Sequence, residues 1–503
     1  RLVQLAEQQQ DGVRSELDAL RARHATIAET VLDAKGAKLW LAAFDRDCHD
    51  LEGILNTVRL TRSAAGAVRD AVVGYGELWS TRLFRDFLAH RGVRRGAIEW
   101  VDARRVLVVE WGALGPAVQW PESKANLAPI AAGAAPRTLI ITGFIASGRN
   151  GVQTTLGRNG SDFSASIFGS LLNAAEIVIW TDVDGVLSAD PRRVPDARVI
   201  DALSYSEAME LAYFGAKVIH PQTMAPAVGR GIPIRIRNTF APDKAGTLIC
   251  AQPHSGMPVK GITSIEQVAL LNVEGAGMIG VPGTAHRLFG ALREADISVI
   301  VISQGSSEHS ICCAVPGVQA DRAVQAVREA FARELADGQI QSVDIDRDLA
   351  ILAVVGDGMA GMPGVSAKVF NALGASSVNV RAIAQGASER NISVVVDGKD
   401  ATRALRAVHA GFYLSPHTLS IGVIGPGTVG RVFLDQVAAQ ANRLRDLKLD
   451  LRVRGILASQ VMTLSDQGLP LDRWRDAVQT DRTAADLARF VEHVRVDYLP
   501  HSV

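Results

Sequence analysis

The sequence predicts an α/β protein that is built from several domains. Strand-like runs alternate with helical stretches between about residues 98 and 250, which is typical of a layered domain with a largely parallel sheet. Further along, a 35-residue segment occurs twice, and near the end a glycine-rich turn follows a strand. With 503 residues the chain is too long for one hydrophobic core, so we expect two to four domains.

The composition excludes several other classes of protein. Hydrophobic residues make up 48% of the chain, which indicates a globular rather than a disordered protein. Lys+Arg and Asp+Glu both number 53, so nothing indicates nucleic acid or an anionic membrane as a partner. No apolar run approaches the roughly 20 residues of a membrane span, and no signal peptide opens the chain. Four scattered cysteines do not form a disulfide framework, so we expect a cytoplasmic protein.

The first domain is expected over residues 1–252. Residues 1–60 are predicted to be helical and have no leading strand, so we expect the chain to begin inside a domain. The strand-like runs that follow are Arg105–Val109, Thr138–Ile141, Ile177–Trp180 and Pro233–Ile236.

A polar, glycine-punctuated loop between Thr154 and Ala165 carries the densest group of functional side chains. Backbone N–H groups at the start of the next helix, expected near Ser164, favour an anion. Arg158 is suited to clamp a carboxylate through two hydrogen bonds. The alternative is a capped helix with a surface ion pair.

The strand Ile177–Trp180 leads into two aspartates, Asp182 and Asp184. Because the carboxyl ends of parallel strands face the ligand crevice, we expect these aspartates to contact a nucleotide or its Mg²⁺. For Asp184 an ordinary Asp-Gly turn is an equal alternative. Lys217 is a cation for phosphate oxygens if it faces the same crevice, and otherwise a solvated charge.

The repeated segment spans residues 277–311 and 358–392 and aligns without a gap at a distance of 81 residues. Fifteen of the 35 aligned positions are identical. Each copy predicts strand, turn, helix, strand, loop and strand, which suits two similar small sandwiches over residues 261–415. Neither copy carries an evident nucleophile, metal cluster or acid/base pair, so the repeats indicate a sensor rather than a reaction centre.

The third region, residues 416–503, begins with the strand Leu419–Ile424. The G-x-G-x-x-G turn Gly425–Gly430 follows, with a helix expected from about Arg431. This context predicts dinucleotide binding, and the alternative is a glycine-rich turn without a ligand. The next strand, Asp450–Leu457, ends without an acidic residue for a ribose hydroxyl, which permits NADP. We expect a partial Rossmann-like domain in which the chain stops within the fold.

Together these residues resemble aspartate kinase of the amino-acid kinase family. The stretches that carry the resemblance are GELWS, TTLGRNGSDFSA, WTDVDGVLSADPR and SYSEAMELAYFGAKVIHPQT, in the expected order. The repeats resemble the paired ACT regulatory domains of that family. The dinucleotide motif resembles the homoserine dehydrogenase part of the bifunctional aspartokinase/homoserine dehydrogenases. The resemblance covers essentially the whole chain and implies an amino-acid-kinase-like three-layer domain, two ACT-like α/β sandwiches and a partial Rossmann-like domain.

The resemblance implies a role for each matching residue. The substrate aspartate would be bound by Glu77, Arg158, Ser161 and Asp162, with Arg158 on the α-carboxylate. The ATP site would be lined by Thr181, Asp182, Leu187, Arg192 and Lys217, and Lys217, Asp162 and Arg158 would be the catalytic residues. The effector threonine would be bound by Gln304, Gln385 and Asn379. The dinucleotide would be bound by Gly425, Gly427, Thr428, Val429, Gly430 and Ala458.

Two departures from the family pattern stand out. The opening Lys-Phe-Gly-Gly-Thr-Ser strand of the family is absent, and Leu187 replaces a common tyrosine.

The implied activity is transfer of the γ-phosphoryl group of ATP, with Mg²⁺, to the β-carboxylate of L-aspartate. This would be the first step of the pathway to threonine and methionine, and a homoserine dehydrogenase using NADPH or NADH would catalyse the third. We expect no metal site formed by the protein alone. We expect a homo-oligomer, either a dimer or a tetramer. Two alternatives remain: a non-catalytic regulatory fragment that binds amino acids, and a kinase regulated by lysine.

Overall fold

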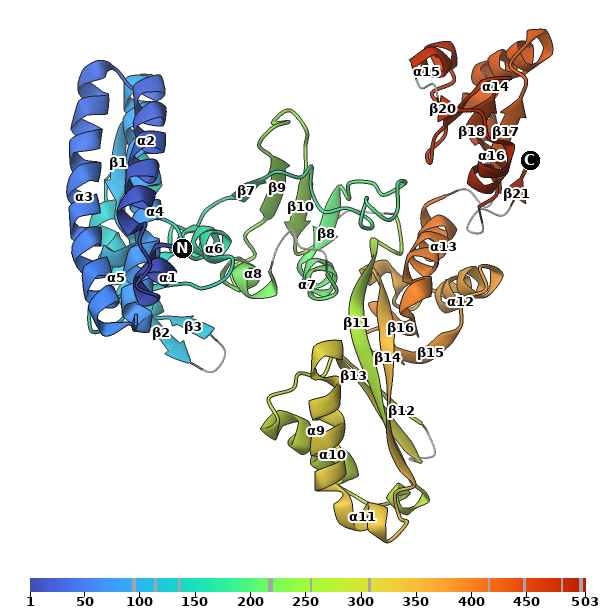
Figure 1. The fold of residues 1–503 in the computed structure, drawn as a ribbon, viewed down its shortest axis with the longest axis horizontal. Coiled ribbons are helices and arrows are strands. Elements are labelled where there is room, and N and C mark those ends of the chain that lie inside the picture. The colour runs from blue at the N-terminus through green and yellow to red at the C-terminus, as the bar shows by residue number, and fades with distance from the viewer. Residues whose placement is uncertain are drawn as a thin grey trace. The chain divides into compact units, whose positions relative to one another are not determined.

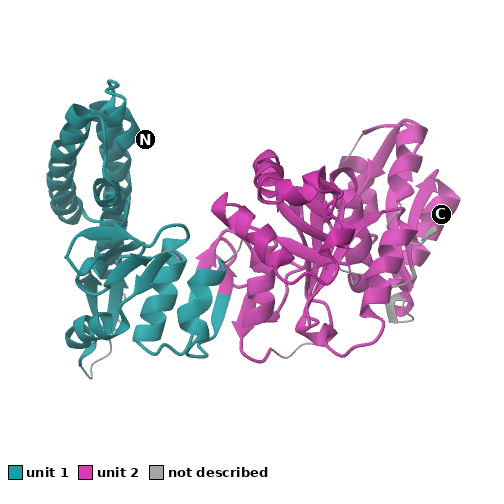
Figure 2. Cartoon of the chain, turned by 90° about the horizontal axis from the view of Figure 1, so that it is seen from below, with its two compact units in different colours: residues 1–179, 219–235 teal, residues 180–218, 236–503 magenta. Residues whose placement is uncertain are grey.

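The computed structural model describes residues 1–92, 96–112, 115–133, 137–215, 220–253, 256–305, 309–414, 417–446, 449–480, 483–496 and 501–503. These residues form two compact units (Figure 2). The first contains residues 1–179 and 219–235, and the second contains residues 180–218 and 236–503. Each unit is described by itself.

The first unit opens with four helices, and the first three confirm the prediction that residues 1–60 are helical. They are α1 (Leu2–Glu7), α2 (Val13–Val31), α3 (Ala34–Thr61) and α4 (Gly66–His90). The core between them is aromatic: Trp40, Phe44 and Trp79 are at most 5% exposed, and the Phe44 and Trp79 rings lie 4.3 Å apart. Asp33 begins α3 by accepting a hydrogen bond from the Gly36 N–H, the usual means of satisfying a free donor at a helix start.

The rest of the first unit is α/β. Strands β1 (Ala97–Val101) and β4 (Arg137–Ile141) pair in parallel. The pairs β2 (Val109–Gly112) with β3 (Gly115–Val118), and β5 (Ile145–Ser147) with β6 (Gln153–Thr155), are antiparallel. Helices α5 (Trp120–Ala131), α6 (Gly160–Leu171) and α8 (Pro221–Val228) complete the unit.

Two predicted boundaries in this unit are wrong. The expected strand Arg105–Val109 is replaced at its start by a 3₁₀ turn, Ala103–Arg105, because Asp102 accepts hydrogen bonds from both the backbone and the guanidinium of Arg104. Only Val109 of that run belongs to a strand. Helix α6 begins at Gly160 rather than near Ser164, after Asn159 adopts a left-handed conformation with φ of 54°.

A four-stranded sheet has the order β7 (Ile177–Thr181), β9 (Ile234–Asn238), β10 (Thr247–Cys250) and β8 (Ala202–Ser204). The pairing of β8 with β10 is parallel, as expected for this domain. Helix α7 (Tyr205–Tyr213) follows β8 and begins with a capping box between Ser204 and Glu207.

The two repeats form one six-stranded sheet (Figure 1). The first repeat supplies β11 (Gly261–Glu274), α9 (Thr284–Glu294), β12 (Val301–Gln304), β13 (Ser310–Pro316) and α10 (Ala320–Ala330), with the short α11 (Ala332–Ala336) after it. The second supplies β14 (Ser342–Val355), α12 (Val365–Ala375), β15 (Val380–Gln385), β16 (Asn391–Asp397) and α13 (Ala401–Tyr413). The strand order is β12-β13-β11-β14-β16-β15, so β11 and β14 join the repeats. The sequence analysis missed the closing helices α10 and α13.

The repeated glycines explain the equal geometry of the two copies. Gly283 and Gly364 immediately precede α9 and α12 and have φ of 93° and 91°, which favours glycine. Each repeat has its own buried core, around Leu288 and Leu292 in the first and Val369 and Leu373 in the second.

The C-terminal region contains a five-stranded sheet of order β20 (Thr483–Ala484), β19 (Val461–Leu464), β18 (Leu449–Leu457), β17 (His417–Ile424) and β21 (His501–Ser502). The pairings of β17 with β18 and β21 are parallel. Helix α14 (Thr428–Asp446) packs on this sheet through Leu434, and it begins three residues earlier than expected. Helix α16 (Leu487–Val494) packs against Gly422 and Gly455, where a Cβ would meet the Phe490 ring at 3.0 Å or less. Helix α15 (Trp474–Thr480) lies between β19 and β20 in the chain. The domain boundaries 1–252, 261–415 and 416–503 stay predictions.

Candidate functional site

In the first unit, the carboxylate of Glu77 lies beside Gly143 and Ser161. Glu77 is on α4, and Gly143 follows β4. A Cβ added at Gly143 would lie 3.4 Å from Glu77 Oε2 and 3.6 Å from Ser161 Cα. Burial raises the pKa of the Glu77 carboxyl, and a hydrogen bond from the Gly143 backbone partly offsets this. The three segments therefore lie side by side, and a Cβ at position 143 would make only ordinary van der Waals contact with them.

The other predicted substrate residues, Asp162 and Arg158, lie within three residues of Ser161 in the chain. Asp162 directly follows Ser161 and is half-buried, and burial raises the pKa of its carboxyl. Arg158 is exposed, and no described residue pairs with its guanidinium. Ser164 fixes the loop by accepting a hydrogen bond from the Phe144 N–H at 2.8 Å and donating one to the Gly160 carbonyl at 2.9 Å. Two half-buried carboxylates and one unpaired cation have the charges that complement a zwitterion.

The hydroxyls of Thr154 and Thr155 have a structural role. Both donate hydrogen bonds to the Asp70 carboxylate, at 3.0 and 3.3 Å. Gln153 donates to the Asp70 carbonyl at 2.8 Å, so these contacts attach β6 to α4. This part of the polar loop is therefore bound to Asp70 of α4, the helix that also carries Glu77.

In the second unit, the end of β7 carries the first predicted nucleotide residues. The Thr181 hydroxyl donates to Asp182 at 3.2 Å, and the Asp182 side chain is exposed. Asp184 accepts hydrogen bonds from Asn238 at 2.7 Å and Lys244 at 2.6 Å, which lower the pKa of its carboxyl. Sequence reasoning missed Lys244 and Asn238. The available signal was the polar turn Asn238–Lys244 after the strand β9.

The remaining nucleotide residues are not gathered into one cluster. Leu187 forms an isolated β-bridge with Val199. The Arg192 guanidinium is held by its neighbour Asp190, at 2.7 and 3.0 Å, and its side chain is 82% exposed. Lys217 lies outside the described residues. The structure therefore brings Thr181 and Asp182 together but shows no contact of Arg192 with them.

The predicted effector residues lie at the second contact between the two repeats, the first being the pairing of β11 with β14. The edge strands β12 and β15 are in contact, and the Ser303 hydroxyl donates to the Ile383 carbonyl at 2.9 Å. Gln304 and Gln385 end these strands at equivalent positions, and both are exposed. Asn379 precedes β15 and is also exposed.

The glycine-rich turn connects β17 with α14. Gly425 has φ of 81°, and a Cβ at Gly430 would lie 2.4 Å from the Gly425 carbonyl oxygen. Both positions therefore require glycine for the turn itself. A Cβ at Gly427 would meet no atom within 4 Å, so glycine at 427 is not needed for folding. Thr428 and Val429 begin α14, and Ala458 follows β18.

Two further findings apply to the residues that the structure describes. They contain no cluster of three or more His, Cys, Asp or Glu side chains arranged to bind a metal ion. No helix among them is long and apolar enough to cross a bilayer.

The comparisons agree with the order of these regions. Residues 10–238 match the amino acid kinase family, and residues 271–331 and 352–412 each match the ACT domain. Escherichia coli aspartokinase III, solved with aspartate and ADP, is 30% identical, with a TM-score of 0.65, over 82% of this chain and 90% of that chain. The kinase-like and ACT-like parts of the predicted fold are thereby confirmed, and they define an amino acid kinase with paired ACT domains.

Curated relatives show which amino acid kinases the chain resembles. The bifunctional aspartokinase/homoserine dehydrogenase 1 of Arabidopsis thaliana, described as chloroplastic, is 43% identical over 100% of this chain and 56% of its own length. The bifunctional enzyme of Haemophilus influenzae is 36% identical over 94% of this chain and 57% of its own length. The lysine-sensitive aspartokinase 3 of Escherichia coli is 32% identical over 82% of this chain and 89% of its own length. The chain belongs to the aspartokinase family, and it spans about half the length of the bifunctional relatives.

The shifted carboxyl pKa of Asp162 generates a stability prediction. At pH 7 the buried carboxylate is charged and opposes folding, and this penalty disappears as the pH falls through the raised folded pKa towards about 3.9, the ordinary value. Asp162→Asn should therefore raise the melting temperature at pH 7 and lose this advantage near pH 4. Differential scanning calorimetry at the two pH values measures both effects.

The control for that experiment has the opposite sign. Asp184 has a lowered carboxyl pKa, so its contribution to stability is present at neutral pH and lost as the pH falls through the folded pKa. Asp184→Asn should not stabilise the protein at pH 7. An Asp162→Asn variant that melts lower at pH 7 than the unsubstituted protein contradicts the assignment of desolvation as the cause.

Proposed function

We propose that this chain transfers the γ-phosphoryl group of ATP to the β-carboxylate of L-aspartate. The observation that carries the proposal is the contact of the half-buried Glu77 carboxylate with Gly143 and Ser161. In the chain, half-buried Asp162 follows Ser161 and unpaired Arg158 precedes it. The ammonium group of an amino acid would offset the desolvation that raises both carboxyl pKa values. Its α-carboxylate would pair with Arg158, and Ser161 would donate a hydrogen bond to it.

The nucleotide would bind at the end of β7. Asp182 is free to bind the Mg²⁺ that accompanies ATP, since Mg²⁺ is usually held by one or two carboxylates together with phosphate oxygens. When bound, the ion would neutralise charge on the phosphates. Thr181, Leu187 and Arg192 would line the same site, and Lys217 would face the phosphates. Lys244 is a further cation in this region, at present paired with Asp184.

The reaction needs little covalent assistance from the protein. A carboxylate is already a nucleophile at neutral pH, so no general base is required. The residues would act by positioning the two substrates in line and by neutralising phosphoryl charge. Arg158, Asp162 and Lys217 are the residues to which we assign these roles.

The repeats would bind a feedback effector at the contact of β12 with β15. We propose threonine, bound by Gln304, Gln385 and Asn379. The whole chain resembles the bifunctional enzymes, and that resemblance implies threonine as the effector. Lysine is the second candidate, since a related solved structure, Escherichia coli aspartokinase III, contains lysine and aspartate. Calorimetric titration with threonine and with lysine separates the two effectors.

The C-terminal region would be the start of a homoserine dehydrogenase that uses NADPH or NADH. The turn Gly425–Gly430 supports this, because its open position at Gly427 permits close approach of a pyrophosphate. Thr428, Val429 and Ala458 would complete the cofactor contacts. The whole protein would then catalyse the first and third steps towards threonine and methionine. The expected cytoplasmic location stays a prediction, because the plant relatives are described as chloroplastic.

A non-catalytic regulatory fragment remains the alternative from another class of protein. It would bind the effector without forming ADP in the presence of ATP and aspartate. A homo-oligomer stays a prediction, which light scattering tests.

Arg158→Ala should raise the KM for aspartate by about 10- to 100-fold, since a lost charged hydrogen bond is worth about 1.5–3 kcal/mol. The KM for ATP should change little. A coupled assay of ADP release measures both constants. Arg149→Ala is the matched control, because Arg149 lies in the turn between β5 and β6 and pairs with Glu110 and Glu122 at the surface. Equal increases in both KM values contradict the proposed clamp.

Gln304→Ala and Gln385→Ala should each weaken inhibition by threonine, roughly tenfold in the half-inhibiting concentration, which corresponds to 1.4 kcal/mol. Turnover without effector should stay near that of the unsubstituted protein. Gln325→Ala, on the exposed face of α10, is the control. Full threonine sensitivity of both variants would exclude these glutamines from the effector site.

Gly427→Ala should weaken NADPH binding by about tenfold, or 1.4 kcal/mol, because the added methyl group occupies the path of the pyrophosphate. The melting temperature should not fall, since the methyl group meets no protein atom within 4 Å. Quenching of NADPH fluorescence measures the affinity. Gly374→Ala, equally open but on α12, is the control. Unchanged NADPH binding by Gly427→Ala argues against a dinucleotide at this turn.

A further inference from the structure

The segment of residues 186–200, which carries Leu187 and Arg192, connects β7 with β8. Its two ends are tied together, since the Ile200 N–H donates to the Val186 carbonyl at 2.9 Å. The Val186 N–H also donates to the Thr247 hydroxyl at 2.9 Å. The middle of this segment, residues 188–198, is fixed by contacts with two other regions of the same unit.

The first region is the second repeat. Ala189 and Val194 of the segment are 5% and 3% exposed and belong to the core of that repeat. The buried Ser188 hydroxyl hydrogen-bonds His409 of α13 at 2.9 Å. Arg193 donates to Thr402 of α13 at 3.1 Å and to Ser264 of β11 at 2.6 Å. One side of the segment is therefore part of the repeat's interior.

The second region is the C-terminal sheet. Asp196 forms an ion pair with Arg452 of β18, and Gln467 donates a hydrogen bond to the Pro195 carbonyl. The side chains of Asp196 and Arg452 are only 11% and 10% exposed. Arg452 also pairs with Asp450 of its own strand at 2.7 Å. Arg452 is thus a buried cation between one carboxylate from each region.

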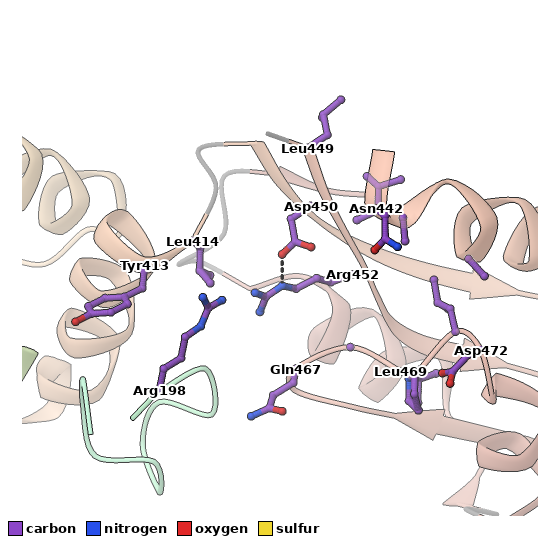
Figure 3. A pocket seen from close by; sticks show the side chains of 16 residues that line it. Arg198, Tyr413, Leu414, Asn442, Leu449, Asp450, Arg452, Gln467, Leu469 and Asp472 are labelled. Carbon is purple, nitrogen blue, oxygen red and sulfur yellow. Dashed lines mark hydrogen bonds and ion pairs between the residues drawn. The ribbon is translucent and has the colours of Figure 1, made fainter. Parts of the chain in front are cut away.

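Arg452 of this ion pair lines a cavity of about 1040 Å³, which Figure 3 shows together with the contact of Arg452 with Asp450. Arg198, Tyr413 and Leu414 line one side of it, and Asp450, Arg452 and Gln467 line the other. Because the cavity separates the two regions here, close apolar packing does not fix their contact at this place. Beside the cavity, the polar contacts of Asp196 and Pro195 hold the segment against the C-terminal sheet.

We propose that Asp196 is a positioning residue for the nucleotide site, held by Arg452 of the C-terminal region. The inference rests on the proposed kinase function and adds to it a connection from the dehydrogenase-like region to the ATP-binding segment. Asp196 does not touch the substrate. It fixes the segment on which Leu187 and Arg192 lie. Loss of the Asp196 side chain therefore changes ATP binding and leaves the proposed aspartate site around Glu77 intact.

The charges explain why this contact is sensitive to substitution. If Asp196 loses its charge, Arg452 keeps Asp450 and remains partly compensated, so β18 can stay folded. The segment, in contrast, loses its ionic attachment to the C-terminal sheet. In Arg452→Met it is Asp196 that is left as a buried charge without its partner, which is strongly unfavourable. We therefore expect the segment to become more mobile without global unfolding.

The test compares Asp196→Asn, Arg452→Met and the double variant in the full chain. Each single variant should raise the KM for ATP by about fivefold, within the range known for coupling residues, and leave the KM for aspartate unchanged. The double variant should be no worse than the more affected single variant, because both remove one interaction. Asp196→Glu should recover most of the ATP affinity.

Amide hydrogen exchange supplies a readout that does not depend on activity. In Asp196→Asn the Val194 and Ala197 amides, which donate to the Asp190 and Val194 carbonyls, should exchange faster. Asp472→Asn is the matched control, because Asp472 lines the same cavity but pairs with its exposed neighbour Arg473. This control should change neither the KM for ATP nor the exchange rates.

Two results overturn the inference: an unchanged KM for ATP and unchanged exchange in Asp196→Asn, or additive effects in the double variant. Failure of the proposed function is recognised separately, as absence of aspartate-dependent ADP formation in the unsubstituted chain. In that case calorimetric ATP binding and amide exchange in the same variants still decide the role of Asp196.

Discussion

The antiparallel pairing of β11 with β14 is the constraint on which the arrangement of the second unit depends. The two 14-residue strands pair from Gly261 opposite Val355 to Glu274 opposite Ser342. Each strand also serves its own repeat, through β13 on one side and β16 on the other. Since strand pairing fixes register, one interface determines where both cores, both glycine turns and both edge strands lie.

This pairing also determines which part of the repeats contacts helix α7 of the kinase-like part. The end of β14 leads to Asp357, whose N–H donates to the buried carboxylate of Glu207 on α7 at 2.8 Å. The same carboxylate accepts the Ser204 N–H at 2.8 Å and completes the capping box of α7. Glu207 is 1% exposed and fully engaged, so a shift of β14 would disturb the start of a helix in the kinase-like part. The repeats and the kinase-like part are therefore joined by direct hydrogen bonds in addition to the chain between them.

The sequence predicted the elements that have a strong local signal. The repeat, the turns at Gly283 and Gly364, the strand β7 and the G-x-G-x-x-G turn all follow from periodicity or from glycine conformations. The expected strand from Arg105 was wrong because Asp102 stabilises a 3₁₀ turn through its side chain, which strand periodicity does not encode. In the polar loop that was singled out, Thr154 and Thr155 bind Asp70, and Asp184 accepts a hydrogen bond from Lys244, 60 residues away in the chain. Such contacts join residues that are distant in the sequence and depend on the tertiary fold, so a local sequence pattern does not predict them.

The contact of β12 with β15 has a consequence for solubility. These strands are the two edges of the six-stranded sheet, and an exposed edge offers unpaired backbone groups to any other strand. In the described structure the two edges face each other, joined by the hydrogen bond from Ser303 to Ile383. A single repeat would present both of its edges to solvent and would be prone to pair with other chains. Duplication of the repeat thus protects the sheet from aggregation at the same place where it creates two equivalent glutamines.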